Sequence, residues 1–428
     1  MKQIKTLFTS ALAMPLALGA FLSTASIDAQ ATAAFARATG SKCDKCHTVA
    51  FPRLTARGER FMRNGFQIKK ENEGGFGLDD DADAEKDKLL NKIGEIISVT
   101  GNFDLAKLKS AETTPQLGVP NSVGFLATST LAKNTPIWAA VDVSSSGGAE
   151  LHRYLVGRTN VLDTTLVNFR AGTLDPTTWT SFYGHSGAID SASSDIGAYG
   201  GGHHGGGANF SQAGPGYGQR NAMEYYGYTE SLMWSAGIGN GDPAANEADA
   251  NDEHAHASGD NFDKLDYWLT SRVDFGKGSS ASLLWYNANG AVESNAATAA
   301  LNIRYKNLDF RSQFTMDTTQ YSGDKYTKYG TTFQLDYKIA DSIMAMYRYD
   351  TTDDGSHGGV ESQMTLALVM KPQQNIRLTA AYVYEQDVAT SAASDGHDHA
   401  HKISTRATGD ETSSGFGNQL TLNLHYMF

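Results

Sequence analysis

The two cysteines of the chain lie close together, in the pentapeptide Cys43-Asp44-Lys45-Cys46-His47. The spacing C-x-x-C-H lets both thiols add to the two vinyl groups of one haem while the adjacent imidazole turns onto the iron. We predict that Cys43 and Cys46 are thioether anchors and that His47 is an axial ligand of the iron. The motif occurs once, so the sequence predicts a single covalent haem c.

Two other chemistries suit a pair of cysteines at this spacing. One is a disulfide between Cys43 and Cys46 in an oxidising compartment, and the other is half of a zinc site. Zinc needs a second pair of ligands nearby. No Cys or His occurs between Thr48 and Leu90. The disulfide therefore stays as the main alternative to the haem.

The sequence leaves three alternatives for the second axial ligand of the iron. Met62 is the one methionine between His47 and the first predicted strand, and methionine opposite histidine raises the potential of a haem. Methionine also fills gaps in apolar packing, and Leu54, Phe61 and Phe66 surround Met62 in a short stretch with helical spacing. Ligation by Met62, ligation by a residue of the following domain and an open position all remain.

A second group of metal-binding side chains lies in long polar segments, beside several carboxylates. Its seven members are His203, His204, His254, His256, His397, His399 and His401. Imidazole with carboxylate suits divalent transition metals, and the acidic neighbours attract cations. We predict that these histidines capture a metal ion. The alternative is that they are parts of polar loops and bind nothing.

The first residues have the pattern of a secretory signal peptide. Two lysines precede an apolar run at residues 7–21, and small residues follow. The run is too short for a spanning helix, which needs roughly twenty residues. Small-x-small cleavage sites end at Ala25 and at Ala31. We assign residues 1–31 to the signal and expect export to an oxidising compartment.

Composition and charge narrow the class of protein. Two cysteines in 428 residues are too few for a disulfide-built secreted protein, whereas 44 Gly, 19 Tyr and 19 Phe favour a β-barrel. The formal charge of -12 argues against a nucleic-acid partner, because binding phosphates needs clustered Lys and Arg.

From about residue 93 onward, apolar and polar residues alternate with a period of two. Phe333, Leu335 and Tyr337, for example, alternate with Gln334 and Asp336. A soluble β-sandwich buries the apolar set, whereas a membrane barrel turns it to the lipid and keeps the polar set in its lumen. The final strand favours the barrel, because it is apolar at every second position and closes on an aromatic residue. We predict sixteen strands, near residues 95–105, 121–130, 135–145, 149–158, 165–174, 221–229, 231–239, 263–275, 279–288, 297–306, 308–317, 328–339, 342–351, 360–370, 375–386 and 416–428.

The predicted connections alternate in length. The short ones are 132–134, 276–278, 307, 340–341 and 372–375. The long ones are 175–220, 240–262, 318–327 and 387–415, and they contain the seven histidines. In outer-membrane barrels short turns face the periplasm and long loops face the exterior. Both chain ends are therefore expected in the periplasm.

Three regions result. Residues 1–31 are the signal peptide, residues 32–90 are a short α-helical monohaem cytochrome c segment with an acidic linker, and residues 91–428 are an all-β transmembrane barrel of the outer membrane. The expected surroundings of the barrel are outer-membrane lipid.

The residues around the haem motif resemble a known family. Cys43 to His47, Phe51-Pro52-Arg53-Leu54, Gly58, Phe61 and Asn64-Gly65-Phe66 are similar to the N-terminal segment of the fused cytochrome-porins of the bacterial outer membrane. Their best-known members are iron oxidases. The resemblance implies a monohaem cytochrome ahead of a sixteen-stranded barrel, oxidation of extracellular ferrous iron, and transfer of electrons to a periplasmic carrier such as a soluble cytochrome.

One haem cannot reach both sides of a hydrocarbon core that is about 30 Å thick. Either the donor or the haem segment must therefore enter the barrel, and a sixteen-stranded barrel is wide enough for a segment to plug its mouth. The leading function is electron transfer from an extracellular donor, as an iron(II) oxidase. The alternatives are a metal-uptake porin with a haem plug and a diffusion porin with an attached haem.

Overall fold

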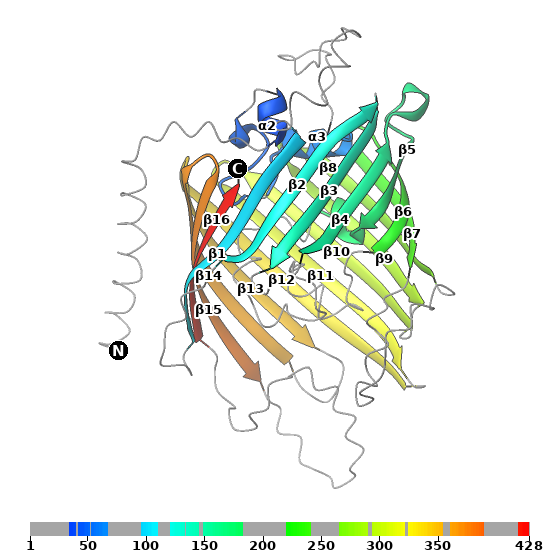
Figure 1. Ribbon diagram of the computed structural model, residues 1–428. Coiled ribbons are helices and arrows are strands. Elements are labelled where there is room, and N and C mark those ends of the chain that lie inside the picture. The colour runs from blue at the N-terminus through cyan, green and yellow to red at the C-terminus, as the bar shows by residue number, and fades with distance from the viewer. Residues whose placement is uncertain are drawn as a thin grey trace, which may run out of the picture.

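The chain forms one closed barrel of sixteen antiparallel strands, with short helices at one end (Figure 1). Each strand pairs with its neighbours in sequence, and β1 pairs with β16 to close the sheet. The computed structural model describes residues 34–39, 42–51, 53–66, 96–109, 120–132, 134–144, 149–182, 220–240, 265–289, 293–321, 324–353, 360–388 and 418–427.

Each predicted strand is present, and the predicted count of sixteen is confirmed. In chain order the strands are β1 (Ile97–Lys109), β2 (Pro120–Ala132), β3 (Thr135–Ser144), β4 (Ala149–Arg158), β5 (Asn168–Leu174), β6 (Arg220–Tyr228), β7 (Leu232–Asn240), β8 (Leu265–Gly276), β9 (Ser279–Asn289), β10 (Glu293–Tyr305), β11 (Leu308–Tyr321), β12 (Asp324–Ala340), β13 (Ile343–Asp353), β14 (Val360–Gln373), β15 (Ile376–Val388) and β16 (Asn418–Met427).

One predicted long connection is wrong. Residues 318–327 were expected to form an exterior loop, but β11 and β12 stay paired as far as Tyr321 and Asp324. Only residues 322–323 connect them. The segment is polar and rich in threonine and tyrosine, and such residues favour strands although they lack an apolar face.

The wall is apolar outside and polar inside, which excludes the soluble β-sandwich. On β12, Phe333 and Leu335 are 43% and 42% exposed, while Gln334 and Asp336 between them are 2% and 0% exposed. The same alternation runs along β8, β9 and β10, where every second side chain is buried. A sheet with this pattern has its apolar face outward, as a barrel in lipid requires.

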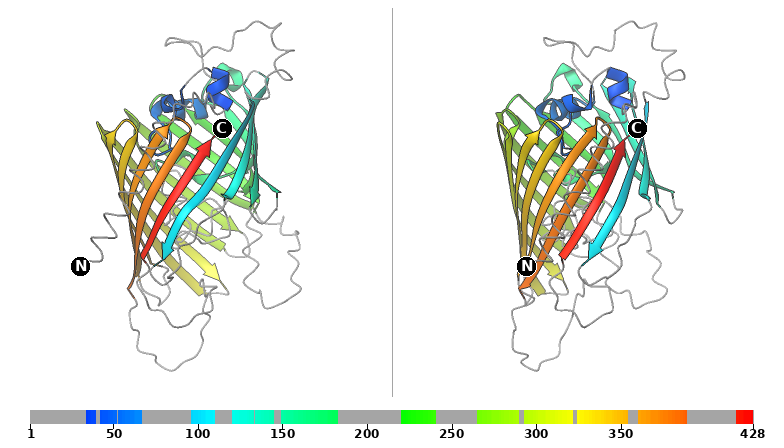
Figure 2. Two further views of the ribbon diagram at one scale, coloured as in Figure 1. Left: turned by 60° about the vertical axis from the view of Figure 1, so that its left-hand side comes forward. Right: turned by 90° about the vertical axis from the view of Figure 1, so that its left-hand side faces the viewer.

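The N-terminal helices lie across the mouth of the barrel at the end that also holds the short turns (Figures 1 and 2). They are α2 (Ala34–Thr39), the single-turn 3-10 helix η1 (Cys43–Lys45) and α3 (Ala56–Arg63). Thr55 caps α3 by accepting a hydrogen bond from the backbone N–H of Gly58 at 3.2 Å. Among the described residues, no helix has the length and apolar content needed to cross a membrane.

The segment after β5 folds into the lumen rather than outward. It contains the 3-10 helix η4 (Pro176–Trp179) and continues to Phe182, which is 4% exposed. Buried Glu224 on β6 accepts hydrogen bonds from the indole N–H groups of Trp179 and Trp268, at 2.8 and 2.9 Å. The guanidinium of Arg311 lies 4.8 Å from the centre of the Phe182 ring. The predicted exterior connection 175–220 therefore begins inside the barrel, and these residues narrow its lumen.

Candidate functional site

The C-x-x-C-H motif forms a compact turn. Cys43 accepts backbone hydrogen bonds from Cys46 at 3.2 Å and from His47 at 2.8 Å. Both cysteines are free thiols with half-buried side chains. Burial raises the pKa of the Cys46 thiol above its ordinary value, against the opposing charge of Arg57. The turn thus presents two thiols and an imidazole within five residues.

The start of α3 holds this turn in shape. His47 and Leu54 form an antiparallel bridge, which folds residues 47–54 into a small loop. Thr55 donates its backbone N–H to the carbonyl of Cys46 and its hydroxyl to the carbonyl of Lys45, both at 2.8 Å. The cap of the helix and the motif are therefore one hydrogen-bonded unit.

Residue 58 must be glycine, because α3 lies very close to the motif at this point. A Cβ atom at this position would lie 2.2 Å from the carbonyl oxygen of Cys46 and 3.0 Å from a methyl carbon of Leu54. The obstacle at 2.2 Å is backbone and cannot rotate aside. Any side chain here must push α3 away from the turn that carries the thiols.

We expect Gly58→Ala to lower the haem content of the protein, because the added methyl group separates α3 from the Cys46 carbonyl. Overpacking of this kind costs about 1–3 kcal/mol. The measurement is haem per barrel, from the absorbance of the alkaline pyridine complex. Arg60→Ala, on the exposed face of the same helix, is the matched control and should keep the wild-type content. Equal haem in both variants would contradict the role assigned to Gly58.

We call residues 42–66 the plug, because buried ion pairs join them to the inner wall. Arg53 is 2% exposed and forms ion pairs with Asp309 on β11 and Asp336 on β12. It also donates to the side-chain oxygen of Asn302 at 3.3 Å. Burial opposes the charged form of Arg53, but the two carboxylates outweigh it and raise its pKa above the usual value. This side of the plug is held by a fully charged, desolvated arginine.

A second ion-pair network joins α3 to β8. Arg63 pairs with Asp274 at 2.7 Å, and Glu59 pairs with Arg272 at 2.5 Å. Arg272 and Asp274 also pair with each other at 2.8 Å. Two charges of the helix thus pair with two of the strand, and Glu59 also lies 4.0 Å from Arg304, which links this network to Asp309 and the Arg53 pairs.

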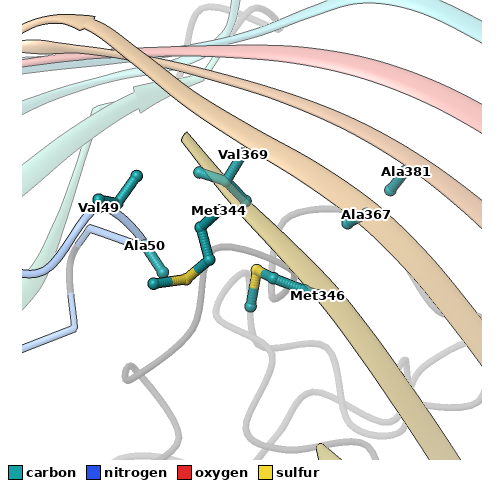
Figure 3. Packing of buried hydrophobic residues seen from close by; sticks show 7 residues of the cluster. All are labelled: Val49, Ala50, Met344, Met346, Ala367, Val369 and Ala381. Carbon is teal, nitrogen blue, oxygen red and sulfur yellow. The ribbon is translucent and has the colours of Figure 1, made fainter. Parts of the chain in front are cut away.

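Apolar and neutral contacts complete the seating of the plug. Figure 3 shows Val49 and Ala50 beside Met344 of β13, in a cluster that continues along the wall with Met346, Val369, Ala367 and Ala381. On the opposite part of the wall, Asn160 donates to the side chain of Asn64 at 2.9 Å, and the hydroxyl of Tyr226 donates to the carbonyl of Arg63 at 3.1 Å. The plug therefore touches the wall around much of its circumference.

The structure places the other predicted ligands as follows. Met62 packs, with Tyr228, against a cluster of Trp179, Tyr226 and Met233. Packing is the alternative expected for Met62, but the expected partners were Leu54, Phe61 and Phe66, whereas this cluster belongs to the barrel wall and the lumen segment. Ligation by Met62 stays a prediction. The seven histidines predicted to capture metal lie outside the described residues. Within the described part of the chain, no group of three or more His, Cys, Asp or Glu side chains could hold a metal ion.

A pocket lies where the plug meets the turn between β14 and β15 and the end of β16. Its lining is Cys43, Phe51, Lys371, Gln374, Asn375, Ile376, Arg377 and His425. The ring centroids of His47 and Phe51 are 4.5 Å apart, and those of Phe51 and His425 are 5.4 Å apart. Sequence reasoning missed His425, although strand alternation could have found it, because it is the one histidine at an inward position of the terminal strand.

Comparison with known proteins supports the architecture. The anion-selective porin of Comamonas acidovorans superposes with a TM-score of 0.53 at 11% sequence identity, over 78% of this chain and 99% of that one. The high-pH structure of Pseudomonas putida OprB gives a TM-score of 0.50 at 9% identity, over 78% and 93%. The fold is that of the porins. No protein-family model and no curated protein matches the sequence.

The residues of this porin-like mouth fit a covalent haem. Two free thiols and an imidazole are the attachment set of haem c, and the Cys43 side chain lines a pocket that also contains two cations, Lys371 and Arg377. Such cations suit the two propionates of a haem. The Nε2 atom of His425 is buried there without a hydrogen-bond partner among the described residues, so the pocket also contains an unused nitrogen donor.

Proposed function

We propose that this chain is an outer-membrane electron-transfer protein. In this proposal it carries one haem c in the mouth of its barrel, oxidises extracellular ferrous iron and passes electrons to a periplasmic carrier such as a soluble cytochrome. The observation that carries the proposal is the attachment of the C-x-x-C-H segment to the inner wall by buried ion pairs, chiefly those of Arg53 with Asp309 and Asp336.

The location follows from the two faces of the wall. The apolar outer face suits lipid and the polar inner face suits a lumen. The plug lies at the end of the short turns, which in outer-membrane barrels faces the periplasm. In this orientation both chain ends are periplasmic, and a carrier in the periplasm has direct access to the plug.

Each group of residues has a distinct task. Cys43 and Cys46 would hold the haem and His47 would bind its iron; the haem would supply one-electron exchange. Arg53 and α3 keep the attachment turn inside the mouth, and Lys371 and Arg377, which line the same pocket as Cys43, would pair with the propionates.

The donor comes from the opposite end, where inward carboxylates lie on the lumen face. Asp266 is the second residue of β8, and Asp317 lies near the end of β11. Both are fully buried and accept hydrogen bonds from wall hydroxyls, those of Tyr286 and Ser294, so they act on an entering cation only through the field of the wall.

The direct test is an anaerobic titration of the oxidised, purified protein with ferrous iron, followed by the haem absorption spectrum. We expect each haem to accept one electron and each added ferrous ion to be used until the haem is reduced. Dithionite supplies the fully reduced reference. A covalent haem that dithionite reduces and ferrous iron does not would overturn iron as the donor.

A second candidate is a porin whose haem segment plugs the channel, for diffusion or for metal uptake. The likeness of the barrel to porins, one of them described as anion-selective, supports this candidate. Metal capture by the seven loop histidines is a prediction that fits this second candidate. It fits delivery of iron to the haem equally well. Solute flux into proteoliposomes distinguishes the two candidates, because a diffusion porin must conduct and an electron carrier need not.

A further inference from the structure

We infer that His425 is the second axial ligand of the haem, opposite His47. The inference rests on the proposed attachment of haem to Cys43 and Cys46 and goes beyond it by assigning the distal side. It assigns this position to His425 and not to Met62, the ligand that the sequence suggests.

The first argument is position. His425 and Cys43 line the same pocket, and Phe51 lines it as well. The Phe51 ring is in contact distance of both imidazoles, tilted by 56° to His47 and by 45° to His425. The two imidazoles therefore contact the same ring, and their centroids are no further apart than the two ring spacings together. A porphyrin bound by both nitrogens would take the place of that ring, and Phe51 would turn aside.

The second argument is the state of the nitrogen. Nε2 of His425 is buried and has no hydrogen-bond partner among the described residues. Burying an imidazole nitrogen without a partner costs free energy, and a bond to iron is one way to satisfy it. Neutral imidazole is a common ligand of haem iron.

The third argument is rigidity. His425 lies on β16, between Asn102 of β1 and Arg377 of β15 in the sheet register. Its backbone is thus held on both sides by strands, whereas the haem attachment turn belongs to the plug. A ligand on a fixed strand favours one geometry at the iron.

Met62 has a different environment. Its side chain packs beside Tyr228 against Trp179, Tyr226 and Met233, on the part of the wall formed by β6 and β7. It does not line the pocket that contains Cys43 and His425. The described contacts thus give Met62 an apolar packing role and leave the distal position to His425.

The test uses the full-length protein in detergent. In the wild type we expect a low-spin ferric haem by electron paramagnetic resonance, and a ferrous haem that does not bind carbon monoxide readily. In His425→Ala we expect the covalent haem to stay on a denaturing gel while the ferric haem becomes high-spin and the ferrous haem binds carbon monoxide. Added imidazole should restore the low-spin spectrum, and His425→Met should raise the potential.

Met62→Leu is the matched control and should keep the wild-type spectrum and potential. A covalent haem with an unchanged spectrum in His425→Ala would overturn the inference, and so would loss of the low-spin state in Met62→Leu. The wild-type carbon monoxide measurement needs no variant, so ready binding there would overturn the inference even if His425→Ala fails to fold. A wild-type protein without covalent haem would instead overturn the proposed function.

Discussion

Replacing both Cys43 and Cys46 by alanine is expected to remove all covalent haem and to abolish reduction by ferrous iron, while the barrel still forms. The thioethers are the only covalent links that the sequence offers, because the chain has no other cysteine. The barrel is closed by its own backbone hydrogen bonds from β1 to β16, so it does not need the thiols. Haem staining after denaturing electrophoresis measures the first effect, and heat-dependent gel migration measures barrel formation.

The same experiment decides between haem and disulfide. Wild-type protein that carries no haem stain, and whose mass rises by two hydrogens on reduction, would establish the Cys43–Cys46 disulfide and end the cytochrome hypothesis. Asp44→Ala and Lys45→Ala change the two residues between the cysteines without touching the attachment chemistry. These variants should keep their haem.

Much of the wall was predictable because a strand exposes alternate residues to two different solvents. Phe333 and Leu335 face outward and Gln334 and Asp336 face inward, and this contrast is strong enough to locate a strand. The prediction was wrong at residues 318–327, where polar side chains continue the ladder without an apolar face. Sequence alternation has no signal for such an extension, because only the pairing partner reveals it.

The position of the plug depends on contacts between residues far apart in sequence. Arg53 meets Asp309 and Asp336 across more than 250 positions, and no local pattern indicates such a pairing. The inward fold of residues 175–182 is similar, since Trp179 is fixed by Glu224 and by packing inside the lumen. The attachment motif, by contrast, is local chemistry, and five adjacent residues are enough to predict it.

Arg53→Met is expected to release the plug and open the barrel to ions. The substitution leaves Asp336 buried with only Arg311, at 3.8 Å, as a described cationic partner, whereas Asp309 keeps Arg304 at 3.0 Å. Breaking a buried pair by removing one partner costs about 3–5 kcal/mol. Because Asp309 keeps a partner, we expect the lower value, which corresponds to a roughly hundredfold larger population of the released state. Conductance in planar bilayers measures this population directly.

Two further variants make the result specific to the ion pair. Arg60→Met removes an exposed arginine from α3 and should leave the conductance unchanged. Arg53→Met combined with Asp309→Asn and Asp336→Asn should restore most of the low conductance of the wild type. The reason is that the cost of the single variant comes from carboxylates left without their partner in the wall. Conductance equal to wild type in Arg53→Met would mean that the network of Glu59, Arg63, Arg272 and Asp274 holds the plug without Arg53. A rise in conductance with no loss of covalent haem would show that the haem-bearing segment is also the gate of the barrel.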